Sequence, residues 1–267
     1  MAEKVMNFFW GNENISWLRY MTLYSFRKYN PDWDIILYKS NQIHSKRLWD
    51  TIEKQDYFEY SGKDYNDKIK DLNIIEQEYS IKNKIDKEIS PNQESDFFRW
   101  KIMSTTGGFY SDMDIIYTRN IEDLYLKTKE YDIGITFTSY YSIGLIFSNG
   151  KNKFFEDVYN ECINNFDNNN YQGAGVRALD KWPIISDIEK NYGKVYNIPF
   201  DLLYQYHSNV IPLIYQVGSS FVLKPDSIGL HWYAGHPLSQ NTNSAINENN
   251  YFGFDNLLGR TLKKVLD

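Results

Sequence analysis

The sequence has a single cysteine, Cys162, and only four histidines in 267 residues. One cysteine excludes a disulfide within the chain, and so few cysteines and histidines argue strongly against a structural zinc cluster. No apolar run reaches the roughly 20 residues that span a bilayer. Basic residues are also fewer than acidic ones, with 29 against 35, so the net charge is −6. This negative net charge argues against a nucleic-acid-binding groove as the main surface.

The first apolar run of the chain, at residues 5–10, is too short for a secretory signal peptide. We therefore expect a cytoplasmic protein. An amphipathic helix is expected at about 256–265, where Arg260, Lys263 and Lys264 provide positive charge. These cations suit peripheral contact with the inner face of an anionic membrane, although packing of this helix on the domain is the simpler role.

What the sequence does have is enough apolar material for a large core. Hydrophobic residues make up 42% of the chain and aromatic residues 17%, with 23 Tyr and 16 Phe. The length suits one large domain or two small ones. Because neither an internal repeat nor an interdomain linker is visible, we predict a single α/β domain.

The pattern of apolar residues predicts an opening strand at 4–10, a helix at 15–29 and a strand at 33–38, which together form a right-handed parallel crossover. Later elements are predicted as follows: helical patches at 46–53 and 68–84, a hairpin of strands at 131–137 and 141–147, a helix at 152–166, a short helix start at 172–181, a strand at 194–200, a pair of short strands within 209–224, and an Asn-rich loop from 238 to 250.

The central stretch, residues 95–114, carries the strongest signal. It reads as a helix with Asn92 or Ser95 as its cap, and apolar side chains cover most of its circumference: Phe97, Phe98, Trp100, Ile102 and Met103. Asp96 and Arg99 lie three residues apart on one face of this otherwise apolar helix. A buried charge must be paired or must hold a ligand, so this pair is a candidate for a functional site.

A glycine pair, Gly107-Gly108, stops the helix, and a strand is predicted over 109–117. In an extended chain Asp112 and Asp114 project to the same side. Two adjacent carboxylates repel each other, and a divalent cation relieves that repulsion. Hard oxygen ligands suit magnesium or manganese, which usually also bind phosphate oxygens.

Three segments carry a resemblance to a known family. The run Ser95-Asp96-x-x-Arg99, then Gly107-Gly108-Phe109-Tyr110-x-Asp112-x-Asp114, resembles the sugar-binding DXD region of glycosyltransferase family 32, the group of yeast mannosyltransferases and α-1,4-galactosyltransferases. It is also similar to the catalytic domain of the large clostridial glucosylating toxins. Phe8-Phe9-Trp10-Gly11 resembles the first-strand segment of these enzymes, and His231-Trp232-Tyr233-Ala234-Gly235 resembles their C-terminal His-x-Trp-Ala-Gly.

The resemblance implies a GT-A fold, a Rossmann-like α/β domain over 1–267 with a mixed central sheet flanked by helices. Residues 1–120 would be the nucleotide-sugar half ending at the DXD motif, and 121–267 the acceptor-side half. The implied activity is metal-dependent, retaining transfer of a hexose or N-acetylhexosamine from a UDP-sugar, favoured over a GDP-sugar. The implied acceptor is a glycan, polysaccharide or lipid-linked oligosaccharide, the implied cofactor is Mn²⁺ or Mg²⁺, and no nucleic-acid partner is expected.

The same resemblance implies residue roles. The catalytic candidates are Asp96, Arg99, Asp112 and Gln172. The donor-binding candidates are Phe9, Trp10, Ser95, Asp96, Arg99, Tyr110, Asp112 and Trp232. The metal candidates are Asp112, Asp114 and His231, with His236 as the alternative histidine because the C-terminal segment departs from the family pattern. Asp96 and Arg99 would hold donor-sugar hydroxyls, and Trp10 would stack on the base.

Several alternatives stay open at this point. The two aspartates also suit a metal-dependent phosphatase, and the protein could be a sugar-binding module with an inactive site. Trp10 could pack only in the core, His231 could be an ordinary histidine at the edge of the core, and Arg99 could form a structural ion pair with Asp96. Gly173-Ala174-Gly175 begins a G-x-G-x-x-A match, but the required preceding strand is missing, so we do not predict a dinucleotide site.

Overall fold

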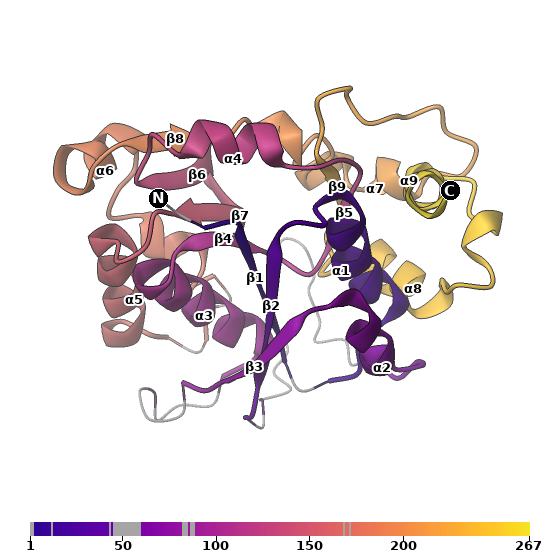
Figure 1. Ribbon diagram of the computed structural model, residues 1–267, viewed down its shortest axis with the longest axis horizontal. Coiled ribbons are helices and arrows are strands. Elements are labelled where there is room, and N and C mark those ends of the chain that lie inside the picture. Colours follow the sequence, from indigo (N-terminus) through magenta and orange to yellow (C-terminus); the bar gives the residue numbers. More distant parts are fainter. Residues whose placement is uncertain are drawn as a thin grey trace.

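The computed structural model describes residues 3–11, 13–42, 44, 60–81, 85, 89–167, 169–170 and 172–267. In these ranges seven strands form one mixed sheet in the order β3-β2-β1-β4-β7-β6-β8, and Figure 1 shows helices on both sides of it. The strands are β1 (Val5–Trp10), β2 (Asp34–Ser40), β3 (Ile75–Tyr79), β4 (Gly108–Ser111), β6 (Ile133–Phe137), β7 (Tyr141–Ser148) and β8 (Val195–Asn197). The predicted α/β fold with a helix-flanked mixed sheet is therefore confirmed.

The first half of this sheet is parallel. β1 pairs with β2 on one side and with β4 on the other, and β2 pairs with β3. Helix α1 (Trp17–Tyr29) joins β1 to β2, and the side chain of Ser16 caps its start by accepting the Arg19 N–H. The predicted crossover is thus confirmed, and it places the end of β1 beside the end of β4.

The second half of the sheet changes direction at β7, which is antiparallel to both β4 and β6. The predicted hairpin is therefore confirmed as β6 and β7, and β8 lies parallel to β6 at the edge. The predicted helix at 152–166 is α5 (Lys153–Asn164), whose start is capped by Asn152.

Two hydrophobic cores fill the two faces of the sheet. In Figure 1, α3 (Pro91–Thr105) and α5 lie on one side, and α1 lies on the other with α7 (Pro212–Tyr215), α8 (Pro237–Ala245) and α9 (Leu257–Leu266). The remaining helices are α2 (Asn66–Ile69), α4 (Glu122–Thr128) and α6 (Ile185–Tyr192), and the 3₁₀ helices are η1 (Lys70–Leu72), η2 (Val176–Leu179), η3 (Phe200–Leu202), η4 (Ser208–Val210) and η5 (Tyr251–Gly253).

A separate two-stranded sheet connects the middle of the chain to its C-terminal part. β5 (Ile115–Tyr117) pairs antiparallel with β9 (Gly229–His231), and Ile115 lies opposite His231. This pairing carries a histidine more than 100 residues away in sequence to the end of the DXD motif.

The strand predicted over 109–117 is interrupted. β4 ends at Ser111 and belongs to the main sheet, whereas β5 begins at Ile115 and belongs to the small sheet. The chain turns at Asp112–Asp114 between the two sheets. The prediction that one extended strand presents both carboxylates on the same side is therefore wrong, and a turn brings them together instead.

Four other local predictions need correction. Residues 75–79 form β3 rather than a helix, because this edge strand is largely exposed and has no apolar pattern to reveal it. Residues 209–224 contain η4 and α7 rather than two strands, with Ile211 and Ile214 buried at a three-residue spacing. The Asn-rich stretch contains helix α8, which buries Ser239 and Asn243. The helical patch predicted at 46–53 lies outside the described residues.

The fourth correction concerns the start of α3. Neither Asn92 nor Ser95 is its cap. The Ser90 side chain accepts the Gln93 N–H, the Gln93 side chain accepts the Ser90 N–H, and Pro91 occupies the first turn. The glycine stop is confirmed, since Gly107 and Gly108 have φ of 77° and 80°. Within the described ranges no helix is long and apolar enough to cross a membrane.

Candidate active site

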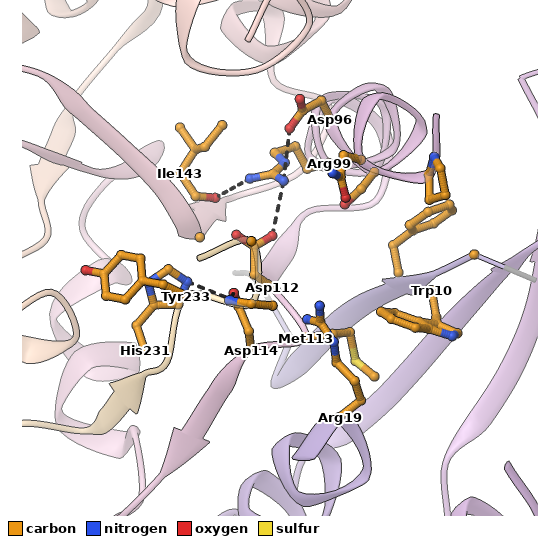
Figure 2. Close-up of a pocket in the computed structure, with 18 of the residues that line it drawn as sticks. Trp10, Arg19, Asp96, Arg99, Asp112, Met113, Asp114, Ile143, His231 and Tyr233 are labelled. Atoms are coloured by element: carbon orange, nitrogen blue, oxygen red, sulfur yellow. Dashed lines mark hydrogen bonds and ion pairs between the residues drawn. The ribbon is translucent and has the colours of Figure 1, made fainter. Parts of the chain in front are cut away.

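A pocket of about 390 Å³ opens where β1 and β4 end, between α3, α1 and the β9 segment. Most of the site residues expected from the sequence line it: Phe9, Trp10, Ser95, Asp96, Arg99, Tyr110, Asp112, Asp114, Gln172 and His231. Figure 2 shows the charged groups of this set turned toward one another. The fold thus brings three distant segments of the chain into one site.

On the α3 side of the pocket, the guanidinium group of Arg99 contacts three other residues. Its Nη2 lies 3.0 Å from Asp96 Oδ1 and 3.1 Å from Asp112 Oδ1, and its Nη1 donates a hydrogen bond to the Ile143 carbonyl oxygen at 2.9 Å. The ion pair with Asp96 that the sequence suggested is therefore present. Arg99 Nε is buried and has no acceptor in the described part of the chain.

Asp96 is buried, with 8% of the residue exposed. Burial raises the pKa of its carboxyl group to about 7, because the favourable charge of Arg99 offsets only part of that effect and the charge of Asp112 adds to it. Burial alone would lower the pKa of Arg99, but Asp112, Tyr110 and Asp96 together raise it above its ordinary value. Arg99 therefore stays charged, whereas Asp96 titrates near neutral pH.

A hydrogen-bond chain fixes Asp112 from the other side. The Tyr110 hydroxyl donates to Asp112 Oδ1 at 2.7 Å, and the Ser95 hydroxyl lies 2.9 Å from the same tyrosine oxygen. The backbone N–H of Asp112 donates to the Gly144 carbonyl oxygen on β7 at 2.8 Å. Burial raises the pKa of Tyr110 well above its ordinary value, so its hydroxyl stays protonated as a donor.

Asp112, Asp114 and His231 form a candidate metal centre, because each offers one ligand atom and these atoms all lie within 4.8 Å of one another. His231 Nε2 is 2.9 Å from Asp114 Oδ1, and the Ala234 N–H donates to Asp114 Oδ2 at 2.9 Å. Two carboxylates and one imidazole are a donor set that fits Mn²⁺ or Mg²⁺. The alternative histidine, His236, instead caps α8 by accepting the Leu238 N–H.

The charge state of Asp114 suits this role. Burial alone would raise the pKa of its carboxyl group, but the His231 ring, the charge of Arg19 and the Ala234 amide outweigh burial and hold the pKa well below its ordinary value. Asp114 is therefore ionised throughout the physiological range, as a metal ligand must be.

The aromatic residues expected to hold the donor have different surroundings. Trp10 is partly exposed in the pocket and its indole N–H donates to the Glu13 carbonyl oxygen at 3.0 Å. Phe9 lines the pocket but is 4% exposed and stacks on Phe98, with ring centroids 5.1 Å apart. Trp232 is fully buried and does not line the pocket.

The side chains of Gln172 and Asp96 both approach the Cα atom of Gly175. A Cβ atom added to this glycine would lie 2.8 Å from Asp96 Oδ2 and 2.9 Å from Gln172 Oε1. The absence of a side chain at Gly175 thus leaves space beside both polar groups. Gln172, which the sequence offered on weak grounds, does lie in the pocket with Asp96.

Sequence reasoning missed several pocket residues. Arg19 from α1 reaches the pocket. Tyr204 also lines it, and its hydroxyl lies near the Asp112 carboxylate, because both groups face Gly144. No motif surrounds either residue in the sequence. The one available signal was the position of Arg19 in the first turn of a helix that follows the Trp10-Gly11 segment.

Comparison with known proteins agrees with this site. Residues 17–131 match the family described as glycosyltransferase sugar-binding region containing DXD motif. This match includes the Asp96–Asp114 region but ends before His231. A search of curated proteins by sequence finds no match.

Solved structures of similar fold are glycosyltransferases. The glycosyltransferase GlyE of Streptococcus pneumoniae TIGR4 aligns over 100% of this chain and 61% of its own, with 13% identity and a TM-score of 0.55. Its apo form aligns over the same shares with 12% identity and a TM-score of 0.52. PaToxG glycosyltransferase aligns over 71% of this chain and 69% of its own, with 16% identity and a TM-score of 0.49.

The fold is therefore the GT-A fold, and the DXD sugar-binding region lies within it. Residues 17–131 thus match the DXD sugar-binding region of glycosyltransferases, and the fold is similar to that of a solved glycosyltransferase. The chain spans about three fifths of the length of GlyE, at 61%. Neither finding favours the phosphatase or the inactive binding module.

Proposed function

We propose that this chain is a metal-dependent, retaining glycosyltransferase that moves a hexose or N-acetylhexosamine from a nucleotide sugar to a glycan or polysaccharide acceptor. A UDP-sugar is the favoured donor over a GDP-sugar, and Mn²⁺ or Mg²⁺ is the cofactor. The observation that carries the proposal is that Asp112, Asp114 and His231 meet in the same pocket as the Asp96–Arg99 pair.

The metal role rests on the donor set. When bound by Asp112, Asp114 and His231, a divalent cation would neutralise the charge of the donor diphosphate, which is the leaving group of the transfer. The hydrogen bonds from the Ala234 N–H and the Tyr110 hydroxyl hold the two carboxylates in place. Such outer contacts orient metal ligands and are a usual part of a metal site.

The sugar role falls to Asp96 and Arg99. Arg99 and Asp96 both line the pocket, and Asp96 Oδ2 faces the space left by Gly175. A guanidinium donor and a carboxylate acceptor that an ion pair holds in place suit the hydroxyls of a pyranose. Trp10 would stack on the base, since its indole lines the pocket on the far side of Arg19 from the acidic cluster.

The transfer itself needs no protein base under this proposal. The acceptor hydroxyl oxygen bonds to the anomeric carbon on the face where the diphosphate departs. The bond between that carbon and the diphosphate oxygen breaks with its electron pair, and the same diphosphate oxygen takes the acceptor proton. The anomeric configuration would be retained, and Gln172, which lines the pocket near Asp96, would be a further protein contact of the donor sugar.

We assign the nucleotide-sugar half to residues 1–120 and the acceptor half to 121–267, which also supplies His231. The chain would act in the cytoplasm on a glycan, polysaccharide or lipid-linked oligosaccharide. Helix α9 buries Leu258, Leu262 and Val265 against the domain, so peripheral contact with a membrane would involve only its cations, Lys263 and Lys264.

The test is turnover of a panel of UDP- and GDP-sugars with Mn²⁺, with Mg²⁺ and with a chelator. We expect hydrolysis or transfer of one donor, dependence on the metal, and loss of activity in Asp114→Asn. Asp123→Asn is the matched control, because Asp123 is exposed on α4 and outside the pocket. The anomeric configuration of the product, read by NMR, tests retention. Turnover that is unaffected by the chelator and by Asp114→Asn would refute the metal-dependent mechanism.

A further inference from the structure

Arg19 is a charged residue of the pocket to which the proposed function assigns no role. It lies in the first turn of α1 and lines the pocket. Its guanidinium carbon is 4.8 Å from the centre of the Trp10 ring and 5.0 Å from that of Trp232. Figure 2 shows Arg19 between Trp10 and the turn that carries Asp112 and Asp114.

This guanidinium group differs from that of Arg99 in its partners. Arg99 has two carboxylates and one carbonyl oxygen within hydrogen-bond distance. In the described ranges Arg19 makes ring contacts but no side-chain hydrogen bond or ion pair. The carboxylates of Asp114 and Asp112 attract Arg19, but burial outweighs this attraction and lowers its pKa below the ordinary value.

A guanidinium group without hydrogen-bond acceptors costs stability unless a ligand supplies those acceptors. Arg19 is half-buried. Even partial removal of a cation from water without hydrogen-bonded partners is unfavourable, and contact with two indoles recovers only part of that cost. The planar guanidinium fork offers five N–H donors, and its geometry matches the oxygens of a phosphate or a carboxylate. The Asp114 carboxylate already accepts hydrogen bonds from His231 and the Ala234 amide.

We infer that Arg19 binds the diphosphate of the nucleotide-sugar donor and of the nucleoside diphosphate product. This inference rests on the proposed function and adds a residue to it. The position fits, because the diphosphate of a donor whose base stacks on Trp10 and whose metal binds Asp114 must run past Arg19. The first turn of α1 favours a negative group in addition, through the helix dipole.

The inference predicts effects of opposite sign on two ligands. Arg19 repels a cation at Asp112 and Asp114, so its removal should leave Mn²⁺ alone bound equally well or more tightly. The same removal should weaken a nucleoside diphosphate, because its oxygens lose charged donors. A structural arginine that merely balances the acidic cluster would not separate the two ligands in this way.

The experiment is calorimetric titration with Mn²⁺ alone, then with UDP and GDP in saturating Mn²⁺, and with uridine and guanosine. The variants are Arg19→Met, which removes the charge but keeps the length, and Arg19→Lys, which keeps the charge. Arg119→Met is the control, because Arg119 is exposed after β5 and outside the pocket. Thermal unfolding of each variant reports on folding.

For Arg19→Met we expect roughly 10- to 100-fold weaker binding of the preferred nucleoside diphosphate, the scale of charge-assisted hydrogen bonds. Binding of Mn²⁺ and of the nucleoside should not weaken, Arg19→Lys should lose less, and Arg119→Met should match the native protein. Unchanged diphosphate affinity in Arg19→Met would overturn the inference, as would equal losses for diphosphate, nucleoside and Mn²⁺. If the native protein itself binds neither diphosphate with Mn²⁺, the proposed function fails, and the inference fails with it.

Discussion

Replacing Arg99 by methionine should expose how strongly the sugar-binding side of the pocket depends on one guanidinium group. The change keeps a long side chain but removes both ion pairs and the hydrogen bond to Ile143. Removing one partner of a buried ion pair costs about 3–5 kcal/mol of unfolding free energy, because the remaining charge loses its compensation. We expect Arg99→Met to fall in this range at pH 8, measured by urea unfolding.

The unfolding free energy lost in Arg99→Met should depend on pH, because Asp96 titrates. The charge of Arg99 lowers the pKa of Asp96, which burial nevertheless raises to about 7. Without Arg99 this pKa rises further, so at pH 5.5 Asp96 is neutral in both proteins and adds nothing to the difference. At pH 8 native Asp96 is ionised, and each unit of pKa difference adds about 1.4 kcal/mol to the cost of Arg99→Met.

The double mutant Arg99→Met/Asp96→Asn measures the energetic coupling between these two residues. Adding Asp96→Asn to Arg99→Met removes the uncompensated carboxylate, and we expect it to recover about 1–2 kcal/mol at pH 8. Arg177→Met removes a charge from an exposed position outside the pocket and should change stability by less than about 0.5 kcal/mol. Additive single effects, or an Arg99→Met cost that is the same at pH 5.5 and pH 8, would refute this electrostatic account.

Three further predictions use other residues. The pKa of the Asp96 carboxyl group is raised from 3.8 to about 7, so its contribution to stability is fully present below pH 4 and is lost as the pH rises through 7. Urea unfolding of the native protein relative to Asp96→Asn should show a loss of about 1 kcal/mol per pH unit in this window. Parallel pH profiles of the two proteins would contradict this prediction. Gly108→Ala should destabilise by about 2 kcal/mol or more, since φ is 80° and the new Cβ would lie 2.8 Å from the Val5 carbonyl oxygen, whereas Gly253→Ala, with nothing within 4 Å, should be nearly neutral in the same assay. Trp10→Leu should weaken nucleotide binding by roughly 10- to 100-fold in calorimetry if the indole stacks on the base, and equal affinity would assign Trp10 to the core alone.

The sequence predicted the part of the site that is local. Asp96 and Arg99 are three residues apart on one helix, and Gly107 and Gly108 must adopt positive φ to start β4. These features depend on neighbouring residues, so spacing and residue type reveal them. The parallel crossover of β1, α1 and β2 was likewise visible, because strand and helix periodicities alternate over a short stretch.

Features that depend on tertiary contacts were not visible. Nothing near Asp114 in sequence indicates that β5 leaves the main sheet to pair with β9. Helix α8 is rich in residues of low helix propensity and is held by contacts such as the hydrogen bond of Asn243 with Ser16. The contact of Arg19 with both Trp10 and Trp232 requires β1, α1 and the segment after β9 to be assembled first.

The central claim is that Asp112, Asp114 and His231 hold a metal that binds a nucleoside diphosphate. Its most direct test is the thermal stability of the native protein and of Asp114→Ala with Mn²⁺, with UDP or GDP, and with metal and nucleotide together. A ligand that binds only the folded state raises the apparent stability. We predict strong stabilisation by one nucleotide in the presence of metal, and loss of this effect in Asp114→Ala. No response to either nucleotide, or an equal response in the variant, would contradict the account.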